Sequence, residues 1–273
     1  MANIIPMAGI GSRFSEAGYL LPKALIPVSG KPMITRVIEA LPPAEKNIFI
    51  VRQEHINQYG IDMLIKQLLP QAIVIPVEKT TEGQACTTML AMPYLEPNDE
   101  MFIAACDNSF VYNRKRYAQL TADSTIDAII WTFTQEKLLV QKPTAWGWVK
   151  LASDGLTIDD MSVKVPVSDN PFNDHAVVAT FYFKKASDFK VAYDLMIQDN
   201  YRINNEFYVD AMPIFYKKLD KRSVMFDVDL YVGWGKPQDL YEYQLWEYVC
   251  EHNRPAPDAA KLPLWRQFFK QLK

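Results

Sequence analysis

Residues 4–32 read IIPMAGIGSRFSEAGYLLPKALIPVSGKP, and the rest of the chain is organised around this stretch. It opens with the apolar pair Ile4 and Ile5, which is typical of the end of a buried parallel strand. The strand gives way to a loop of small residues, Met7-Ala8-Gly9-Ile10-Gly11-Ser12-Arg13-Phe14. Small residues let the backbone approach a ligand, and successive N–H groups in such a loop line an anion-binding concavity. The stretch therefore predicts a strand followed by a phosphate-binding loop.

Two cations follow this loop. Arg13 closes it, and Lys23 comes directly after Pro22. A loop that wraps phosphates, an Arg for the outer phosphates and a Lys for the inner phosphate together form a triphosphate grip. Two glycines in a turn often serve the turn alone, and this loop lacks both the third glycine of the dinucleotide fingerprint and the GK[ST] of a P-loop. Neither of those two phosphate sites is expected here.

Composition limits the classes of function that need to be considered. The 273 residues suit one large α/β domain or a domain with an appendage, and 49% of them are apolar. Lys and Arg number 29 against 32 Asp and Glu, which gives a formal charge of −3 with no basic run. We therefore expect no nucleic-acid partner, and phosphate binding must come from a few focused cations.

Cysteine usage and the first residues bear on the compartment. Cys86, Cys106 and Cys250 are widely spaced and form no CxxC pair, which is typical of buried thiols in a reducing compartment. The start, MANIIPMAG, has no basic region followed by a long apolar run, and no run reaches the length of a membrane span. These features predict a cytoplasmic protein.

Strand and helix patterns alternate along the chain. Strands are expected at residues 47–51, 72–77, 100–105, 126–134 and 222–228. Helices are expected at residues 34–41, 61–69, 185–199, 206–218, 239–250 and 261–273. This alternation predicts βαβ units and a doubly wound, mostly parallel sheet flanked by helices. In such sheets ligands bind beyond the carboxyl ends of the strands, where the opening loop lies.

The combination of GxGxRF with the later PKALIPVSGKP resembles the signature of the sugar nucleotidyltransferase family. The resemblance covers roughly residues 3–242 and implies a Rossmann-like, GT-A-like fold with a mixed, mostly parallel sheet. It also implies roles for the opening stretch: Arg13 holds the triphosphate, and Lys23 touches the phosphate under attack. The remaining nucleotide contacts that it implies in this loop are Ala8, Gly9, Gly11 and Ser12.

The next loop, EKTTEGQACTT at residues 78–88, needs no ligand if it is only a turn before a helix. TEGQACT resembles the family branch that occurs in genes for capsule and surface polysaccharide, and this implies nucleobase contacts from Gly83 and Gln84. Relatives specific for uracil or thymine often carry Gln five residues before this glycine, where this chain has Glu78. A carboxylate only accepts hydrogen bonds, so it suits the amino group of cytosine and not the carbonyl of uracil. Our hypothesis is therefore CTP.

A metal ligand is expected at Asp107, which follows the strand at residues 100–105. Mg²⁺ takes one or two carboxylates plus phosphate oxygens, although an Asx turn or a helix cap explains this Asp equally well from the residues alone. The resemblance implies the Mg²⁺ role for Asp107. In the later run DLYVGWGKPQDL at residues 229–240, Gly233 stands where many family members have a second metal-binding Asp. Either Asp229 or a water then completes the metal site.

Acceptor contacts are implied by three further elements. WGWVK at residues 146–150 resembles the YGVV element, in which Gly147 lets the acceptor approach; the flanking tryptophans either stack on a ligand or pack in the core. SVKVP at residues 162–166 implies that Lys164 grips the acceptor phosphate. Val163 stands where sugar-specific members carry Glu, which puts a hexose 1-phosphate in doubt. Glu206 is an acceptor contact by family analogy, or else first-turn charge on a helix.

The resulting hypothesis is a Mg²⁺-dependent nucleotidyltransferase that couples CTP to a phosphorylated small molecule and releases pyrophosphate, for capsule or surface-polysaccharide biosynthesis. Phosphocholine, phosphorylated amino-acid derivatives such as phosphoglutamine, and sugar phosphates remain open as acceptors. The alternatives are a GT-A glycosyltransferase that uses the DxD at residues 227–229, and a non-catalytic nucleotide-binding homologue.

The expected organisation is a nucleotidyltransferase domain at residues 1–242, with a nucleotide-binding half at about 1–135 and an acceptor-binding half at about 136–242. A helical tail at 243–273 follows. Its apolar face packs either on the body or on a partner, which includes a second copy in a homo-oligomer.

Overall fold

The computed structural model describes residues 1–272, so Lys273, the last residue of the predicted tail helix, lies outside the described residues. Within this range nine strands form one mixed sheet in the order β10-β9-β11-β6-β1-β4-β5, and β8 joins it by pairing with β11 and β12. Its strands are β1 (Ala2–Met7), β4 (Lys46–Arg52), β5 (Ile73–Val77), β6 (Met101–Ala104), β8 (Ala128–Phe133), β9 (Gly147–Leu151), β10 (Ile158–Val163), β11 (His175–Phe183) and β12 (Ser223–Asp227).

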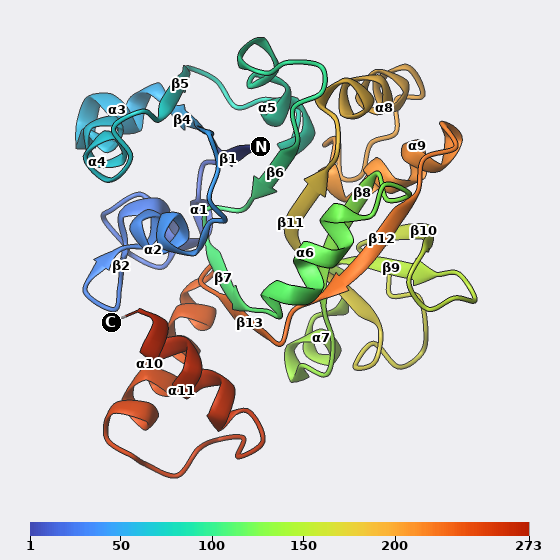
Figure 1. The fold of residues 1–273 in the computed structure, drawn as a ribbon. Coiled ribbons are helices and arrows are strands. Elements are labelled where there is room, and N and C mark those ends of the chain that lie inside the picture. Colours follow the sequence, from blue (N-terminus) through green and yellow to red (C-terminus); the bar gives the residue numbers. More distant parts are fainter. Residues whose placement is uncertain (273) are drawn as a thin grey trace.

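The amino-terminal part of this sheet is parallel, since β1 pairs in parallel with both β4 and β6, and β4 pairs in parallel with β5. β11 runs antiparallel to β6, β8 and β9, and so connects the two parts of the sheet. Figure 1 shows the two parts side by side, with β1, β4 and β5 on the left and β8, β11 and β12 on the right. The predicted mixed α/β fold is confirmed.

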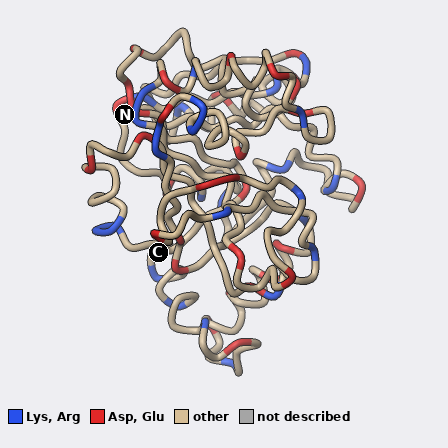
Figure 2. The backbone as a smooth tube through the Cα atoms, turned by 90° about the vertical axis from the view of Figure 1, so that its right-hand side faces the viewer, with Lys and Arg blue, Asp and Glu red and all other residues tan. Residues whose placement is uncertain are grey.

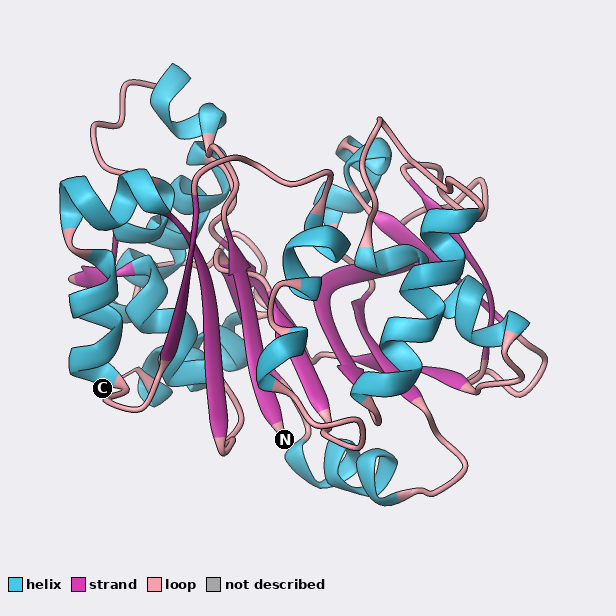
Figure 3. Cartoon of the chain, turned by 90° about the horizontal axis from the view of Figure 1, so that it is seen from above, coloured by secondary structure: helices cyan, strands magenta, loops and turns pink. Residues whose placement is uncertain are grey.

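Helices cover both faces of the sheet (Figure 3). They are α1 (Ser12–Glu16), α2 (Met33–Ala40), α3 (Gln53–Tyr59), α4 (Ile61–Leu68), α5 (Gln84–Met89), α6 (Arg114–Ala122), α7 (Lys137–Gln141), α8 (Ala186–Gln198), α9 (Met212–Lys218), α10 (Pro237–Glu251) and α11 (Leu262–Gln271). The 3-10 turns are η1 (Lys23–Leu25), η2 (Met92–Tyr94), η3 (Pro143–Ala145) and η4 (Val209–Ala211). Two small antiparallel ladders join β2 (Pro27–Val28) to β3 (Lys31–Pro32), and β7 (Asn108–Val111) to β13 (Leu230–Gly233).

One predicted helix begins later than expected. The sequence predicts a helix over residues 206–218, but η4 begins at Val209 and α9 at Met212. Glu206 instead lies in a tight loop in which it forms an isolated bridge with Ile203. The interpretation of Glu206 as first-turn helix charge is therefore wrong, because no helical turn contains it.

The carboxy-terminal helices pack on the body of the protein. The helix α10 runs through the expected boundary at residues 242–243 without interruption. The Ser29 hydroxyl bonds to the Tyr243 hydroxyl and to Glu247, and Arg36 donates to the carbonyl of Leu272 at 3.3 Å. Figure 1 shows α10 and α11 below β2, next to the carboxy-terminal end. The apolar residues of these helices also share one buried cluster with Ile26 and Val28, so the tail covers the second half of the opening stretch.

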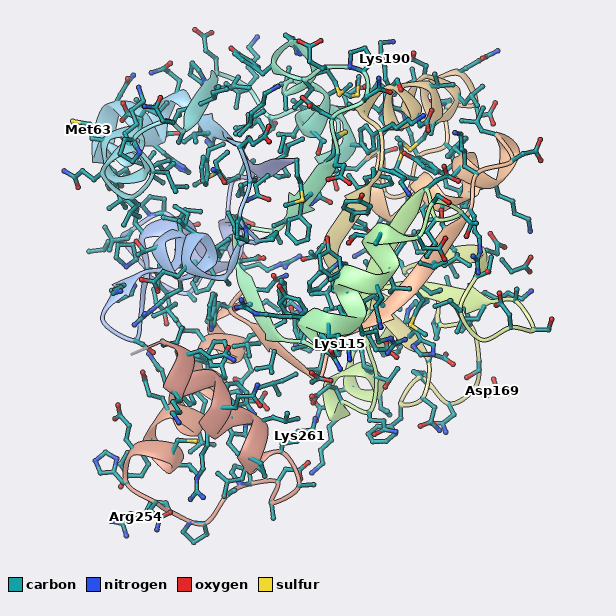
Figure 4. The ribbon with its side chains drawn as sticks, viewed as in Figure 1. Met63, Lys115, Asp169, Lys190, Arg254 and Lys261 are labelled. Atoms are coloured by element: carbon teal, nitrogen blue, oxygen red, sulfur yellow. The ribbon has the colours of Figure 1, made fainter. Side chains whose placement is uncertain are left out.

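Charged residues of both signs are interspersed along the whole backbone (Figure 2). Figure 4 places the exposed side chains of Met63 and Lys190 at the outer edges of α4 and α8. None of the helices in the described residues is both long enough and apolar enough to span a membrane.

Candidate active site

The phosphate-binding loop begins where β1 ends. Met7 and Ala8 are buried, and the chain then opens into an exposed turn at Gly9 and Ile10. Gly11 has φ 70° and ψ 25°, the left-handed conformation that favours glycine, and it directly precedes α1. Phe14 is 1% exposed and anchors α1 in the core. These contacts fix the backbone on which Arg13 is placed.

The second cation of the grip pairs with the predicted metal ligand. Lys23 begins η1 directly after Pro22, and Asp107 follows β6. The Lys23 Nζ donates to the Asp107 Oδ2 at 2.6 Å, and about a quarter of each side chain is exposed. Burial alone would lower the pKa of Lys23, but the Asp107 carboxylate outweighs burial and raises this pKa well above its usual value. Lys23 therefore keeps its charge beside Asp107 in the ligand-free protein.

All the predicted nucleotide-binding residues except Glu78 line one cleft of about 540 Å³. Arg13, Lys23 and Asp107 lie in its wall, and Glu206 reaches it from the other part of the molecule. A volume of this size suits a nucleotide-sized ligand. The predicted residues that share this cleft are Ala8, Gly9, Gly11, Ser12, Arg13, Lys23, Gly83, Gln84, Asp107 and Glu206.

Gly83 joins the nucleotide-binding half to the loop that contains Glu206. Its φ is +128°, and an added Cβ would lie 2.5 Å from the carbonyl oxygen of Phe207. On either side of this contact, the amide of Phe207 donates to Glu82 at 2.8 Å and the amide of Ala85 donates to Phe207 at 3.0 Å. Gly83 is therefore needed for a close backbone approach, whatever its contact with a nucleobase.

Glu78 lies just beyond β5, in an exposed turn. The cleft lining includes Thr80, Thr81, Gly83 and Gln84 from the same loop. Glu78 is not among the described residues that line the cleft. Its predicted contact with the base stays a prediction.

Lys164 flanks the cleft instead of lining it. Its φ is +70°, its amide donates to the Trp146 carbonyl at 2.8 Å, and its Nζ donates to the Ala145 carbonyl at 3.0 Å. The same Nζ lies 5.6 Å from the ring centroid of Tyr208. Burial and the neighbouring Glu206 carboxylate raise the pKa of Tyr208 to about 12. Tyr208 thus lies between the predicted acceptor lysine and the cleft residue Glu206.

The side chain of Asp210 leaves no room for a side chain at Gly147. A Cβ there would overlap the carboxylate of Asp210. Asp210 is 9% exposed, and its burial raises its pKa to about 6, although the Lys164 charge lowers it. A buried carboxylate with a raised pKa next to a cleft is a feature that recurs at functional sites. Sequence motifs did not single out Asp210.

Asp229, which the sequence offered beside a water as the second metal ligand, lies away from Asp107. The β13–β7 ladder pairs Leu230 with Val111 and Gly233 with Asn108. Asp229 thus lies at the far end of this ladder from Asp107, about 13 Å along an extended strand. Its side chain is exposed there.

The carboxylate that does approach Asp107 is Asp239. An added Cβ at Gly235 would lie 2.9 Å from the Asp107 Oδ2 and 3.9 Å from the Asp239 Oδ2. Burial raises the pKa of Asp239, the Lys236 charge lowers it, and the Asp107 charge raises it further. The sequence reasoning missed both Lys236 and Asp239, because their approach to the cleft depends on the register of β13.

The side chains at the Asp107 end of the cleft suit Mg²⁺, provided that the protein supplies one or two of its ligands. Residues 1–272 contain no group of three or more His, Cys, Asp or Glu side chains that would bind a metal by themselves. Mg²⁺ commonly takes one or two carboxylates and completes its shell with substrate phosphates and water. Asp107 in the cleft, with Asp239 behind it, meets that requirement.

A comparison of the sequence with protein families matches residues 3–153 to the MobA-like NTP transferase domain. Among curated proteins, the bifunctional protein GlmU of Thermosipho melanesiensis is 26% identical over 157 residues, which are 57% of this chain and 31% of that protein. GlmU of Thermotoga petrophila is 30% identical over 104 residues, which are 38% of this chain and 21% of that protein. The chain thus spans less than a third of the length of these relatives.

Solved structures with the same fold cover nearly the whole chain. A nucleoside-diphosphate-sugar pyrophosphorylase from Vibrio cholerae RC9 has a TM-score of 0.72 at 19% identity, over 88% of this chain and 98% of that one. An inositol-1-phosphate CTP transferase from T. maritima has a TM-score of 0.67 at 16% identity, over 89% and 94%. HddC from Yersinia pseudotuberculosis has a TM-score of 0.61 at 18% identity, over 89% and 97%. At these identities the likeness establishes the fold.

Proposed function

The chain belongs to the family of MobA-like NTP transferase domains, and we propose that it transfers a cytidylyl group from CTP to a phosphorylated small molecule with release of pyrophosphate. The observation that supports this most strongly is the convergence of Arg13, Lys23 and Asp107 on one cleft with the loop at residues 8–12. These residues come from three separate segments, and a triphosphate with a metal ion accounts for all of them at once.

In this reaction an oxygen of the acceptor phosphate attacks the α-phosphorus of CTP, and the bond to pyrophosphate breaks. The nucleophile is already an anion, so positioning and charge neutralisation must lower the barrier without a general base. Lys23 neutralises charge at the α-phosphate, and Arg13 holds the leaving pyrophosphate. Mg²⁺ held by Asp107 would add charge neutralisation between the phosphates.

The Lys23–Asp107 pair sets the order of events. In the ligand-free protein each group neutralises the other at 2.6 Å. When a nucleotide binds, the Lys23 ammonium exchanges the carboxylate for phosphate oxygens, and the Asp107 carboxylate would then be free to hold a metal ion. The pair therefore keeps two opposite charges in place until the substrate replaces both partners.

The choice of CTP rests on the base-recognition loop. Glu78 accepts hydrogen bonds and cannot donate them, which suits the exocyclic amino group of cytosine. Gln84 lines the cleft at the start of α5, and its amide both donates and accepts. The fold neighbour from T. maritima is described as a CTP transferase, which is consistent with this choice.

The acceptor proposal follows from Lys164 and from Val163. Lys164 places an ammonium beside Gly147 and Tyr208, where a phosphate would be adjacent to the nucleotide cleft. Val163 offers no hydrogen bond to sugar hydroxyls, so phosphocholine and phosphorylated amino-acid derivatives join sugar phosphates as candidates. A product of this kind would serve capsule or surface-polysaccharide biosynthesis.

A glycosyltransferase is the second candidate, and its DxD motif argues against it. Asp227 accepts from the Thr132 hydroxyl at 2.6 Å and lies 3.0 Å from the His175 Nδ1, so its carboxylate is already engaged. Asp229 is exposed at the remote end of β13. Neither is among the described residues that line the nucleotide cleft.

A screen for pyrophosphate release tests the proposal. Four NTPs are combined with Mg²⁺ and a panel of phosphorylated metabolites, and we expect release with CTP and a subset of acceptors. Lys23→Ala serves as the catalytic control, with CD spectra to verify its fold. Release of a nucleoside diphosphate from nucleotide sugars would instead identify a glycosyltransferase. Nucleotide binding without any release would identify a non-catalytic module, and turnover with UTP but not CTP would refute the cytidylyl assignment.

A further inference from the structure

Lys236 lies in the short connection between β13 and α10, where it precedes Pro237 at the start of the helix. The amide of Trp234 donates to the Asp107 carbonyl at 2.8 Å, and Gly235 lines the nucleotide cleft. A Cβ at Gly235 would come within 2.9 Å of the Asp107 carboxylate. The backbone at Lys236 is therefore fixed beside the end of the cleft where the metal ion is expected.

The side chain of Lys236 extends from this point to the ring of Trp146. Its Nζ lies 5.9 Å from the ring centroid of Trp146, while the Lys164 Nζ bonds to the carbonyl of Ala145, the preceding residue. Two ammonium groups thus approach the segment at residues 145–147 from different elements. Lys236 comes from the metal side of the cleft, and Lys164 comes from the acceptor side.

Asp239 and the buried Asp210 lie near these two lysines, but neither carboxylate forms an ion pair with them in the described residues. Within residues 1–272, Lys236 forms no ion pair shorter than 4.0 Å. Burial lowers the pKa of Lys236, and the nearby charges of Arg13, Lys142 and Lys164 lower it further, against a raising effect of Asp239. A half-buried cation among three others is less stable than it would be in water, unless an anion binds between them.

We propose that Lys236 is a phosphate-binding residue of the acceptor subsite, where it and Lys164 together hold a phosphomonoester dianion beside the Asp107 end of the cleft. This inference rests on the proposed function and adds the charge class of the acceptor. A phosphomonoester has a charge of about −1.5 to −2 at neutral pH, which two ammonium groups match. The acceptor phosphate would then lie between the two lysines and next to the α-phosphate that it attacks.

A structural role for Lys236 makes the opposite prediction about stability. Lys236→Met keeps an unbranched side chain over Trp146 and removes the charge. If the Lys236 charge instead stabilises the fold, through the Trp146 ring or Asp239, this substitution lowers the melting temperature. If the role of Lys236 is to bind an anion, the ligand-free variant is as stable as the wild type or more stable, because the substitution relieves the repulsion among the cations.

The acceptor is not yet identified, so the experiment uses inorganic phosphate as the probe. The protein is first saturated with Mg²⁺ and a CTP analogue that has a methylene bridge between the α- and β-phosphorus, and phosphate is then titrated in a calorimeter. We expect Lys236→Met to weaken phosphate binding by roughly tenfold or more, the loss of one charge-assisted contact. Lys236→Arg should retain most of the affinity. The matched control is Lys150→Met, which removes an exposed lysine of β9 whose charge lies near Asp159.

Each other outcome overturns the inference. Equal phosphate affinity in Lys236→Met and the wild type would exclude a contact between Lys236 and phosphate. If Lys150→Met lost as much phosphate affinity as Lys236→Met, the effect would come from the overall charge of the protein and not from a contact. A matching loss of affinity for the CTP analogue would assign Lys236 to the triphosphate. A wild type that binds the analogue but not phosphate refutes this inference alone, whereas a wild type that does not bind the analogue refutes the proposed function first.

Discussion

Replacing Gly83 with Ala should separate the structural role of this residue from its predicted contact with the nucleobase. Gly83 has φ +128° and ψ 174°, a region that side chains rarely enter. The Cβ of Ala would lie 2.5 Å from the Phe207 carbonyl oxygen and 2.6 Å from its amide nitrogen. Both contacts are with backbone atoms, so no side chain can rotate away. The two segments must therefore move apart.

The expected loss of stability has two parts. Holding a non-glycine residue in this backbone conformation costs about 1–3 kcal/mol. Moving Phe207 away also disturbs its hydrogen bonds with Glu82 and Ala85, of 2.8 and 3.0 Å, each of which contributes about 0.5–1.5 kcal/mol. Together these give about 2–6 kcal/mol. For a protein of this size, that corresponds to a fall in melting temperature of roughly 4–24 °C.

Gly9→Ala is the matched control. No described atom lies within 4 Å of a Cβ built at Gly9, and its φ lies outside the left-handed range. We expect its free energy of unfolding to stay within about 0.5 kcal/mol of the wild type, while nucleotide affinity falls because the methyl group enters the phosphate cleft. Urea unfolding and titration of CTP with Mg²⁺ measure the two effects. A Gly83→Ala protein as stable as Gly9→Ala would refute the reasoning.

Three further predictions concern charge. Asp107→Asn should fold but reduce pyrophosphate release by roughly 10²–10³-fold, and a wild-type rate would remove Asp107 from the site. Burial raises the pKa of Asp210 to about 6, well above the usual value of an Asp carboxyl, so the folded protein binds this proton more tightly and loses stability as pH rises from about 4 through 6. Asp210→Asn should therefore be more stable than the wild type by up to about 3 kcal/mol at pH 8, and urea unfolding should find the gap closed near pH 4. Glu78→Gln should shift the ratio of kcat/KM for CTP over UTP toward UTP, and an unchanged ratio would show that Glu78 does not contact the base.

The sequence predicts most of the sheet because its strands are short apolar runs with clear ends. Prediction from the sequence fails where the local pattern is weak or where contacts with distant residues override it. The helix α3 (QEHINQY) has no buried residue, so it presents no apolar periodicity to recognise. Around Glu206 the pattern is helical, but the backbone of Phe207 bonds to Glu82 and Ala85 instead. A partner more than a hundred residues away cannot be deduced from helical periodicity.

The same distinction applies to the site. Arg13 and Lys23 belong to one continuous stretch, so family resemblance places them directly, and the cleft contains both. The second carboxylate depends on the register of β13 against β7, which the sequence leaves open. That register brings Gly235 to Asp107, and with it Asp239 in place of Asp229. In this motif a glycine stands at the position where a metal ligand is expected. The sequence alone cannot show which neighbouring carboxylate takes the place of that ligand.

The site must create a local positive potential in a protein whose formal charge is −3. Each cation is fixed by a nearby feature of the backbone: Arg13 by the buried Phe14, Lys23 by η1, and Lys236 by the start of α10. The tail helices then cover residues 24–36 from outside, through the buried Trp246, Trp265 and Phe268. Because exposed charges are screened within about 10 Å at ordinary salt, the overall negative charge does little to oppose a phosphate already inside the cleft. Fixing the cations reduces the cost of reorganising them when the phosphate binds, so anion binding here depends on local geometry and not on net charge.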